Sequence, residues 1–243
     1  SNGYTYESAA RAINEDRADL IWMGRNLMVD PAYPKKLQQG RIEDIRPCAR
    51  CMHCVGKLWL NVPIECRWNA FMGHEHEIGD GQDFTPAKRK KKVMVVGAGP
   101  GGMEAARVAA LRGHEVTLYD KSKWLGGLMP LAAFIKESGY DFDTVKPTLD
   151  WYERQLRKLP NVTIRLGVEV DATLVEREKP DAIIISPGSK WVVPDIPGKD
   201  RKNVVTTGQL IGYSRGFFKD KAQKIIILGG DLKGAESAEF FIR

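Results

Sequence analysis

The feature that most constrains the fold is the run "KVMVVGAGPGGMEAARVAALRGHEVTLYD", residues 92–120. An apolar strand, a glycine turn, a helical stretch and a second apolar strand follow one another, with Gly97, Gly99 and Gly102 in G-x-G-x-x-G spacing. The first glycine permits a tight turn, the second lets the backbone approach a pyrophosphate, and the third lets helix and strand pack closely. The helix start favours negative charge, and Asp120 ends the second strand where it could accept hydrogen bonds from a ribose. The run therefore predicts a site for an adenine dinucleotide or nucleotide rather than a bare glycine turn.

The chain continues in the alternating pattern of the same fold. A helix is expected over 143–159, and apolar strands over 162–170 and 181–186. A second strand, glycine turn and helix start follow in "KIIILGGDLKGAESAEFFIR", residues 224–243, with the strand over 224–228. There Gly229, Asp231 and Gly234 align with the first loop, so that an acid replaces the middle glycine. A carboxylate would repel a pyrophosphate, so this second loop has a shifted register, binds weakly, or binds no dinucleotide.

All four cysteines lie in one short segment with little regular periodicity, spaced C-x2-C-x2-C-x11-C. They are Cys48, Cys51, Cys54 and Cys66. Four thiolates with a C-x2-C-x2-C run are typical of a [4Fe–4S] cluster. A structural zinc ion, which usually takes two separated pairs, and four unrelated buried cysteines are the alternatives. His53, His74 and His76 are expected to be loop residues, because four thiolates already complete the coordination.

Composition describes an ordinary globular protein, with 43% hydrophobic and 28% charged residues among 243. The net charge of +6 and the run "KRKKK" at 88–92 predict a solvated linker rather than a nucleic-acid surface. No apolar run is long enough to span a membrane, and the first residues do not resemble a signal peptide. We therefore expect a cytoplasmic protein with reduced thiols, no nucleic-acid partner and no membrane contact.

The first residues cannot complete a fold by themselves. A helix is expected over 5–18, a short buried strand over 19–24 ("DLIWMG") and a second helix over 34–39. A parallel strand needs neighbours, with helices on both faces of the sheet. This zone is therefore expected to be part of a larger βα array, or to be completed by a partner chain.

Several runs together resemble a known family over essentially the whole chain. These are "MGRNLMVDPAYPKKLQQGRIEDIRPCARC" (23–51), "GAGPGGMEAARVAALRGHEVTLYD" (97–120), "LGGLMPLAAFIK" (125–136) and "DAIIISPGS" (181–189). They resemble the multidomain relatives of old yellow enzyme, which include 2,4-dienoyl-CoA reductase, 2-enoate reductase, and trimethylamine and histamine dehydrogenases. The resemblance implies an α/β chain: the tail of a (β/α)8 barrel, a [4Fe–4S]-binding loop segment, and an incomplete Rossmann-like FAD/NAD(P)-type domain.

The domain boundaries that this resemblance implies divide the chain into five parts. They are the end of an FMN barrel at 1–45, an iron–sulfur segment at 46–80, a basic linker at 81–92, an FAD- or ADP-binding domain at 93–222, and the truncated start of an NAD(P)-binding-like domain at 223–243.

In that family the barrel holds FMN and acts on a small-molecule substrate, the cluster relays single electrons, and FAD exchanges hydride with NAD(P)H. The implied activity is a flavin- and iron–sulfur-dependent oxidoreductase that reduces enoate or enoyl-type compounds. In the amine dehydrogenase branch the second domain holds only ADP, and the cluster passes electrons to a protein partner. "CRWNA" (66–70) echoes the amine dehydrogenases, whereas "GGLMPLAAFIK" and "DWYERQL" look reductase-like, so FAD is favoured and ADP stays open.

The resemblance also assigns cofactor positions. For FAD or ADP they are Gly97, Gly99, Gly102, Asp120, Gly127, Val170 and Gly188. For the FMN phosphate they are Gly3, Gly24 and Arg25, with a surface ion pair as the alternative role of Arg25. Because most barrel strands are missing, no catalytic residue is assigned, and a barrel portion or a partner chain that supplies it is expected, as is a homo-oligomer.

Overall fold

The structure is a computed structural model of the chain. It describes residues 5–81, 84–137, 145–189, 192–206, 209, 224–230, 234, 235, 237, 238 and 241. Gly3 and Asp231, which the sequence analysis singled out, lie outside these residues.

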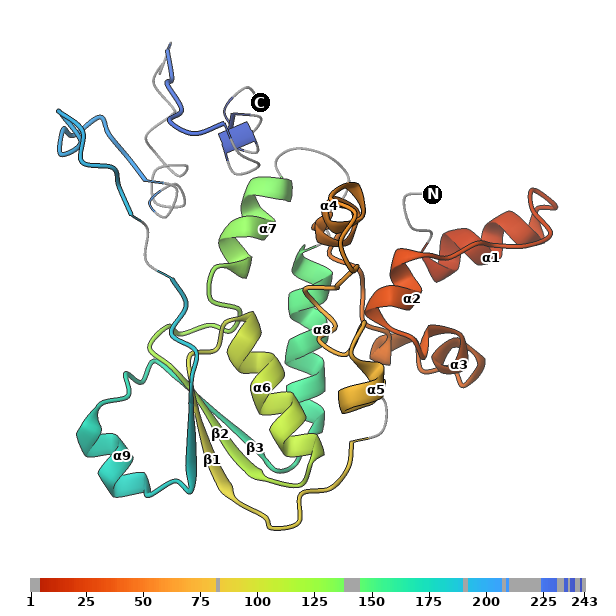
Figure 1. Cartoon of the computed structure of the whole chain (residues 1–243), viewed down its shortest axis with the longest axis horizontal. Coiled ribbons are helices and arrows are strands. Elements are labelled where there is room, and N and C mark those ends of the chain that lie inside the picture. Colours follow the sequence, from red (N-terminus) through yellow and green to blue (C-terminus); the bar gives the residue numbers. More distant parts are fainter. Residues whose placement is uncertain are drawn as a thin grey trace.

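A four-stranded parallel sheet, ordered β3-β2-β1-β4, forms the centre of the larger part of the molecule (Figure 1). Its strands are β1 (Lys92–Val96), β2 (Glu115–Asp120), β3 (Val162–Leu166) and β4 (Ala182–Ile185). Side chains alternate along a strand, so Val93 and Val95 join one core cluster while Met94 and Val96 join another. The strand order reverses at β1, which has β2 on one side and β4 on the other. In open α/β sheets this reversal marks the crevice where ligands bind.

Two long helices cover one face of the sheet (Figure 1). They are α6 (Pro100–Leu111) and α8 (Val145–Lys158), and α7 (Met129–Glu137) packs against α8. The apolar stripe of α8 places Trp151, Tyr152 and Leu156 in the main core beside the small residues of α6. The helix predicted at 143–159 is therefore confirmed over its described residues.

The second core cluster is closed by α9 (Ala172–Glu178). This helix begins where the Asp171 carboxylate accepts a hydrogen bond from the Leu174 N–H at 2.8 Å. Leu174 then packs against Met94 and Tyr119 of the sheet. One short helix therefore covers this face of the sheet, whereas two long helices cover the opposite face.

The amino-terminal helices project away from the sheet, on the right of Figure 1. They are α1 (Tyr6–Asn14), α2 (Arg25–Val29), α3 (Tyr33–Gln38) and the 3-10 turn η1 (Ile42–Asp44). Asp44 joins this part to α8, because its main-chain oxygen accepts from Trp151 Nε1 at 3.0 Å and its carboxylate accepts from Lys158 at 2.8 Å. The helix predicted at 5–18 is confirmed with shorter bounds, and the helix predicted at 34–39 is confirmed one residue earlier, at 33–38.

The cysteine segment is more regular than its sequence suggests. It contains α4 (His53–Trp59), and α5 (Glu75–Ile78) follows it. Arg50 and Met52 adopt left-handed backbone conformations, with φ of 49° and 57°, immediately before α4. The helix α4 has only seven residues and none of them is buried, so no apolar stripe marks it in the sequence.

Two predicted strands do not form in the described part of the chain. Residues 19–24 make no strand, and Leu20 and Trp22 are 87% and 89% exposed. Residues 224–230 also make no strand, and Ile226 is almost fully exposed. A strand is stabilised by its hydrogen-bonded neighbours, and no described segment pairs with either run.

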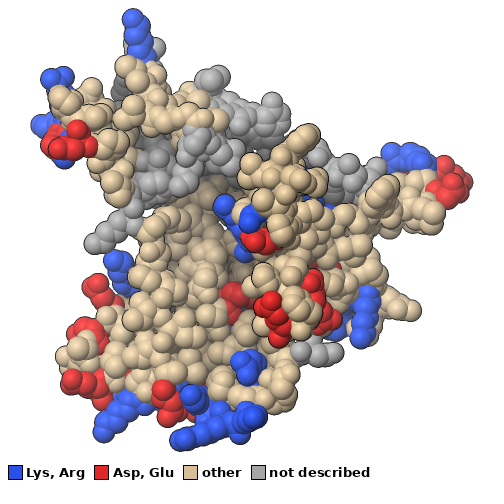
Figure 2. Space-filling view, in the orientation of Figure 1, with Lys and Arg blue, Asp and Glu red and all other residues tan. Residues whose placement is uncertain are grey.

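Charged side chains of both signs alternate along the lower edge of the molecule in Figure 2, where the basic run 88–92 enters β1. Lys90 pairs with Glu115 at 2.9 Å and Lys92 with Glu178 at 3.5 Å. The run is thus exposed but partly neutralised by acidic neighbours. Among the helices that the structure describes, none combines the length and the apolar character that a membrane crossing requires.

Candidate functional site

The glycine loop leaves the carboxyl end of β1, at the point where the strand order reverses. Gly97 has a φ of +102°, which favours glycine, and its N–H donates to the Tyr119 carbonyl at 2.8 Å. A Cβ on Gly97 would lie 2.1 Å from the Ser186 carbonyl oxygen, at the end of β4. The turn can therefore be this tight only with glycine at this position.

Gly102 allows α6 to approach β1. A Cβ on Gly102 would lie 1.7 Å from the Gly97 carbonyl oxygen and 2.7 Å from Ser186 Oγ. Any side chain here would push the helix away from the strand. Ser186 closes the contact, because its hydroxyl lies 3.1 Å from both the Val96 and the Gly97 carbonyl oxygens and can donate to either.

Gly99 has a different surrounding from the other two glycines. It precedes α6 in an extended conformation, and a Cβ there would have no described atom within 4 Å. Pro100 occupies the first helical position, and no side chain caps the start of α6. The first N–H groups of this twelve-residue helix therefore have no side-chain cap among the described residues, which suits a phosphate.

Asp120 and Gly127 both touch the loop. Asp120 Oδ2 accepts from the Ala98 N–H at 2.6 Å, and Oδ1 accepts from the Ser122 N–H at 2.7 Å. A Cβ on Gly127 would lie 3.1 Å from the Cα of Gly99. Each carboxylate oxygen has more than one acceptor position, so Asp120 can hold the loop and still accept from a ligand.

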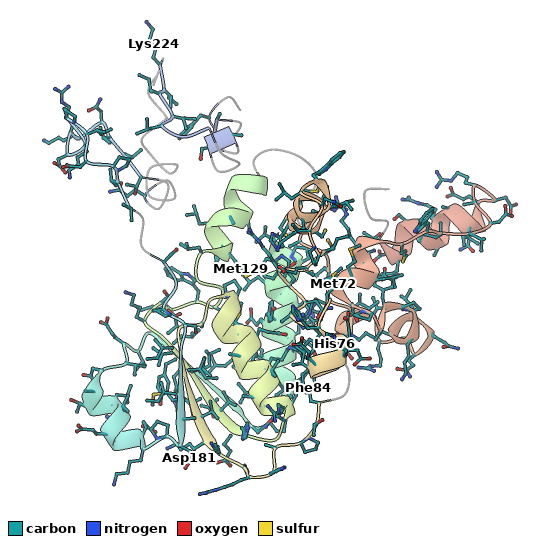
Figure 3. The ribbon with its side chains drawn as sticks, in the orientation of Figure 1. Met72, His76, Phe84, Met129, Asp181 and Lys224 are labelled. Atoms are coloured by element: carbon teal, nitrogen blue, oxygen red, sulfur yellow. The ribbon has the colours of Figure 1, made fainter. Side chains whose placement is uncertain are left out.

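The remaining predicted nucleotide residues end the neighbouring strands. Val170 follows β3 and packs into the second core cluster, and Gly188 follows β4 with a φ of +77°. Figure 3 shows Met129, at the start of α7, on the side of the molecule that carries the glycine loop, and Asp181 at the opposite edge of the sheet. The nucleotide positions thus gather at the carboxyl ends of parallel strands.

The four cysteines lie close enough to influence one another, and none is in a disulfide. Burial raises the pKa of the Cys48 thiol; the Arg50 N–H opposes the rise, and the Cys51 and Cys54 thiols add to it. Burial likewise raises the pKa of the Cys66 thiol, against the N–H groups of two residues that follow it, and Cys48 and Cys51 add to the rise. These backbone donors favour the thiolate form, but burial outweighs them, so the pKa of both thiols stays above its usual value.

The donor set, four thiols of which three follow C-x2-C-x2-C spacing, has the chemistry that a [4Fe–4S] cluster takes. Within the described residues, no group of three or more His, Cys, Asp or Glu side chains is arranged to hold a metal ion. Zinc needs four ligand atoms within about 2.3 Å of one centre. A [4Fe–4S] cluster is a larger object held by four cysteines, so its thiolates need not converge on one point. The three nearby histidines are half-buried or exposed and contact acidic side chains instead.

The segment is tied to both neighbouring parts of the chain by residues that the sequence analysis did not identify. Arg46, two residues before Cys48, donates to the Trp68 carbonyl and to Glu104 Oε1 at 3.2 Å. Its guanidinium stacks over the Trp151 ring at 4.3 Å. No local sequence signal marks the contacts of Arg46, because Trp68 and Glu104 lie 22 and 58 positions away from it.

Asn69 fastens the other end of the segment. Its side-chain nitrogen donates to the Met28 carbonyl at 2.9 Å, and its oxygen accepts from the Phe71 N–H at 3.2 Å. Buried polar side chains that are fully paired specify one loop conformation. The asparagine of the "CRWNA" run therefore connects the cysteine segment to the amino-terminal helices.

A cavity of about 440 Å³ lies between α1, α2, the cysteine segment and α8. Its lining includes Cys48 and four arginines: Arg25, Arg46, Arg50 and Arg154. Gly24 precedes α2, and Arg25 begins it and donates to Met52 Sδ at 3.3 Å. Within the described part of the chain no carboxylate forms an ion pair with Arg25, so a surface ion pair does not explain it.

Three comparisons agree with this arrangement. The chain is 37% identical over 238 residues to "NADH oxidase" of Thermoanaerobacter brockii, covering 96% of this chain and 35% of that protein. The solved 2-naphthoyl-CoA reductase complex matches 98% of this chain and 34% of its own, with a TM-score of 0.80 and 31% identity. Histamine dehydrogenase from Rhizobium sp. 4-9 matches 79% and 27%, with a TM-score of 0.71 and 28% identity. The chain spans about a third of these relatives, and the resemblance to the 2-enoate reductase group is confirmed.

The family comparison covers the glycine loop and all that follows it. The description "Pyridine nucleotide-disulphide oxidoreductase" matches residues 91–243, which include the sheet and every predicted FAD or ADP position. The chain belongs to the pyridine nucleotide-disulphide oxidoreductase family.

Proposed function

We propose that this chain is the electron-relay part of an NAD(P)H-dependent oxidoreductase that contains FAD and a [4Fe–4S] cluster. Electrons would enter as hydride from NAD(P)H, pass singly through the cluster, and reach an FMN barrel that reduces an enoate or enoyl-type substrate. Binding of FAD and NAD(P)H is implied by the family, and reductase activity is named for relatives such as cinnamate reductase and 2-naphthoyl-CoA reductase.

The observation that supports this proposal most strongly is that the cysteine segment and the glycine loop belong to one packed unit. Arg46 joins the segment to α6, the helix that begins at the glycine loop. A bound cluster supplies single-electron storage, and bound FAD supplies exchange between two-electron and one-electron transfer. The amino end of α6 would bind the pyrophosphate, Asp120 would orient the ribose, and the N–H groups near Cys48 and Cys66 would stabilise the thiolates.

The amino-terminal helices would form the end of the FMN barrel. Arg25 and the neighbouring arginines of the cavity provide positive charge for the FMN phosphate, together with the main chain at Gly24. The exposed Leu20 and Trp22 are suited to pack against further barrel strands, on this polypeptide or on a partner chain. The substrate would bind in that barrel portion. We further propose a homo-oligomer in the cytoplasm, where the thiols stay reduced.

The direct test is to purify the chain without oxygen and to measure iron, sulfide, zinc and released nucleotide in the same sample. We expect a broad visible absorption that dithionite bleaches, with iron, sulfide and FAD in fixed ratio to protein. A colourless protein that contains zinc but no iron or sulfide would instead indicate a zinc-bound nucleotide module without a redox role.

A second candidate function is favoured by one observation, the likeness to histamine dehydrogenase. In this alternative the nucleotide domain holds ADP as a fixed structural element, and the cluster passes electrons to a protein partner. Acid extraction separates the two functions: ADP without flavin fluorescence supports the amine-dehydrogenase-like chain, and FAD supports the reductase-like chain.

A further inference from the structure

Arg46 occupies a place from which one side chain contacts both ends of the cysteine segment. It lies two residues before Cys48, and its guanidinium donates to the carbonyl of Trp68, two residues after Cys66. Its own N–H donates to Asp30 Oδ2 at 2.8 Å, and Asp30 is also paired with Lys36. The two ends of the segment are therefore fixed to each other through this one residue.

The same guanidinium reaches the nucleotide domain. It lies 3.2 Å from Oε1 of Glu104, the fifth residue of α6. Arg107 holds that carboxylate from the other side with two hydrogen bonds of 2.8 Å. Burial would raise the pKa of Glu104, but the hydrogen bonds and charges of Arg107 and Arg46 outweigh it and hold that pKa below its usual value. Glu104 is therefore a charged, doubly bound anchor one turn into the helix that starts at the glycine loop.

The geometry of Arg46 leaves little room for movement. Only 6% of the residue is exposed, and its guanidinium is stacked on Trp151 with the Tyr152 ring 5.9 Å away. A planar guanidinium can bond a carbonyl and a carboxylate while stacking on an aromatic ring, whereas a lysine ammonium cannot do all three. The Trp68 ring lies 6.4 Å from Tyr152, so the aromatic packing continues back to the cysteine segment.

We propose that Arg46 is the positioning residue that sets the separation between the cluster cysteines and the nucleotide loop, and with it the rate of electron transfer between the two centres. This inference rests on the proposed function. The transfer concerned would take one electron from bound, reduced FAD to a bound, oxidised cluster, so that the flavin would lose one electron and the cluster would gain one. Arg46 takes no part in the chemistry. Its role would be to hold the cysteine segment against α6.

The test compares the unaltered chain with two variants. Arg46→Met keeps the apolar stem over Trp151 but removes the guanidinium, and Arg46→Lys keeps the charge. Arg157→Met is the matched control, because Arg157 is an exposed arginine of α8 whose one ion-pair partner among the described residues is Glu153. For each protein, iron and FAD per chain are measured first. A light flash with a deazaflavin photodonor then reduces the flavin, and the absorbance of the cluster reports the transfer. Electron paramagnetic resonance measures the magnetic coupling between the flavin reduced by one electron and the reduced cluster. This coupling reports their separation independently of turnover.

We expect Arg46→Met to retain iron and FAD, to transfer electrons about tenfold more slowly or worse, and to show a weaker and more heterogeneous coupling. The transfer rate and the coupling of Arg46→Lys should lie between those of Arg46→Met and those of the unaltered chain. Arg157→Met should match the unaltered chain in both. If Arg46→Met retains both centres with unchanged rate and coupling, the proposal is overturned and the proposed function stands. Loss of iron from both Arg46 variants would also overturn it, because Arg46 would then be needed to bind the cluster and not to set its separation from the nucleotide loop. An unaltered chain that lacks iron or FAD would overturn the proposed function and this inference together.

Discussion

The glycine loop allows a prediction in which two similar substitutions have opposite effects on stability. Gly102→Ala places a Cβ where the Gly97 carbonyl oxygen lies 1.7 Å away, and that oxygen is backbone, which cannot rotate aside. Alanine in a helix gains about 1 kcal/mol over glycine. Overpacking against fixed atoms costs about 1–3 kcal/mol or more. We expect the clash to exceed the gain, so that the free energy of unfolding falls by about 2 kcal/mol.

Gly99→Ala should behave in the opposite way. Its Cβ meets no described atom within 4 Å, and the backbone at this position is extended, which alanine adopts without strain. Because alanine restricts the unfolded chain, we expect a stability gain of about 0.4–1 kcal/mol. The same Cβ would fill the approach to the amino end of α6. We therefore expect FAD to bind at least about tenfold more weakly, which corresponds to about 1.4 kcal/mol.

Urea unfolding of nucleotide-free protein measures the first effect, since bound nucleotide would add its own stabilisation. Quenching of flavin fluorescence on titration with FAD measures the second. The steric reasoning would be refuted if Gly99→Ala lost as much stability as Gly102→Ala. The assignment of the pyrophosphate to this loop would be refuted if Gly99→Ala bound FAD with unchanged affinity.

Three further predictions concern the thiols, the join to α8 and the acid beside the loop. Cys51→Ser should lose most of its iron and become more sensitive to proteolysis near the cluster segment while retaining nucleotide; iron content equal to the unaltered chain would contradict the cluster assignment. At Asp44, burial raises the pKa, but hydrogen bonds led by that from Lys158 outweigh it and hold the pKa well below its usual value. Asp44→Asn should therefore lower the free energy of unfolding by about 1 kcal/mol near neutral pH. The loss should shrink below about pH 4, as the carboxyl group in the unfolded chain becomes protonated, and urea unfolding at both pH values tests it. Asp120→Asn should weaken the charge-assisted bond to the Ala98 N–H, destabilise the loop by about 1–2 kcal/mol and reduce nucleotide retention; normal retention after gel filtration would count against a role in binding.

The central α/β unit could be read from the sequence because its determinants are local. The apolar runs of β1 and β2, the three glycines and the helix between them follow within 29 residues. The close approach of Gly102 to the Gly97 carbonyl is also local, whereas the contact of Gly97 with Ser186 spans 89 positions. Sequence reasoning placed these elements correctly. It also expected strands at 19–24 and 224–228, which do not form in the described residues. Strand formation depends on a neighbour that supplies hydrogen bonds, and an apolar run does not reveal whether one is there.

The sequence by itself determined the dinucleotide-type fold, the glycine positions and the grouping of the four thiols, since each is carried by short spacing. Only the tertiary structure decided how these parts are joined. Arg46, Glu104 and Trp151 are far apart in the chain, and a buried arginine gains partners only when three separate elements pack around it. The connection between the thiols and the nucleotide loop is thus a property of long-range packing, because its energy comes from contacts that no local pattern encodes.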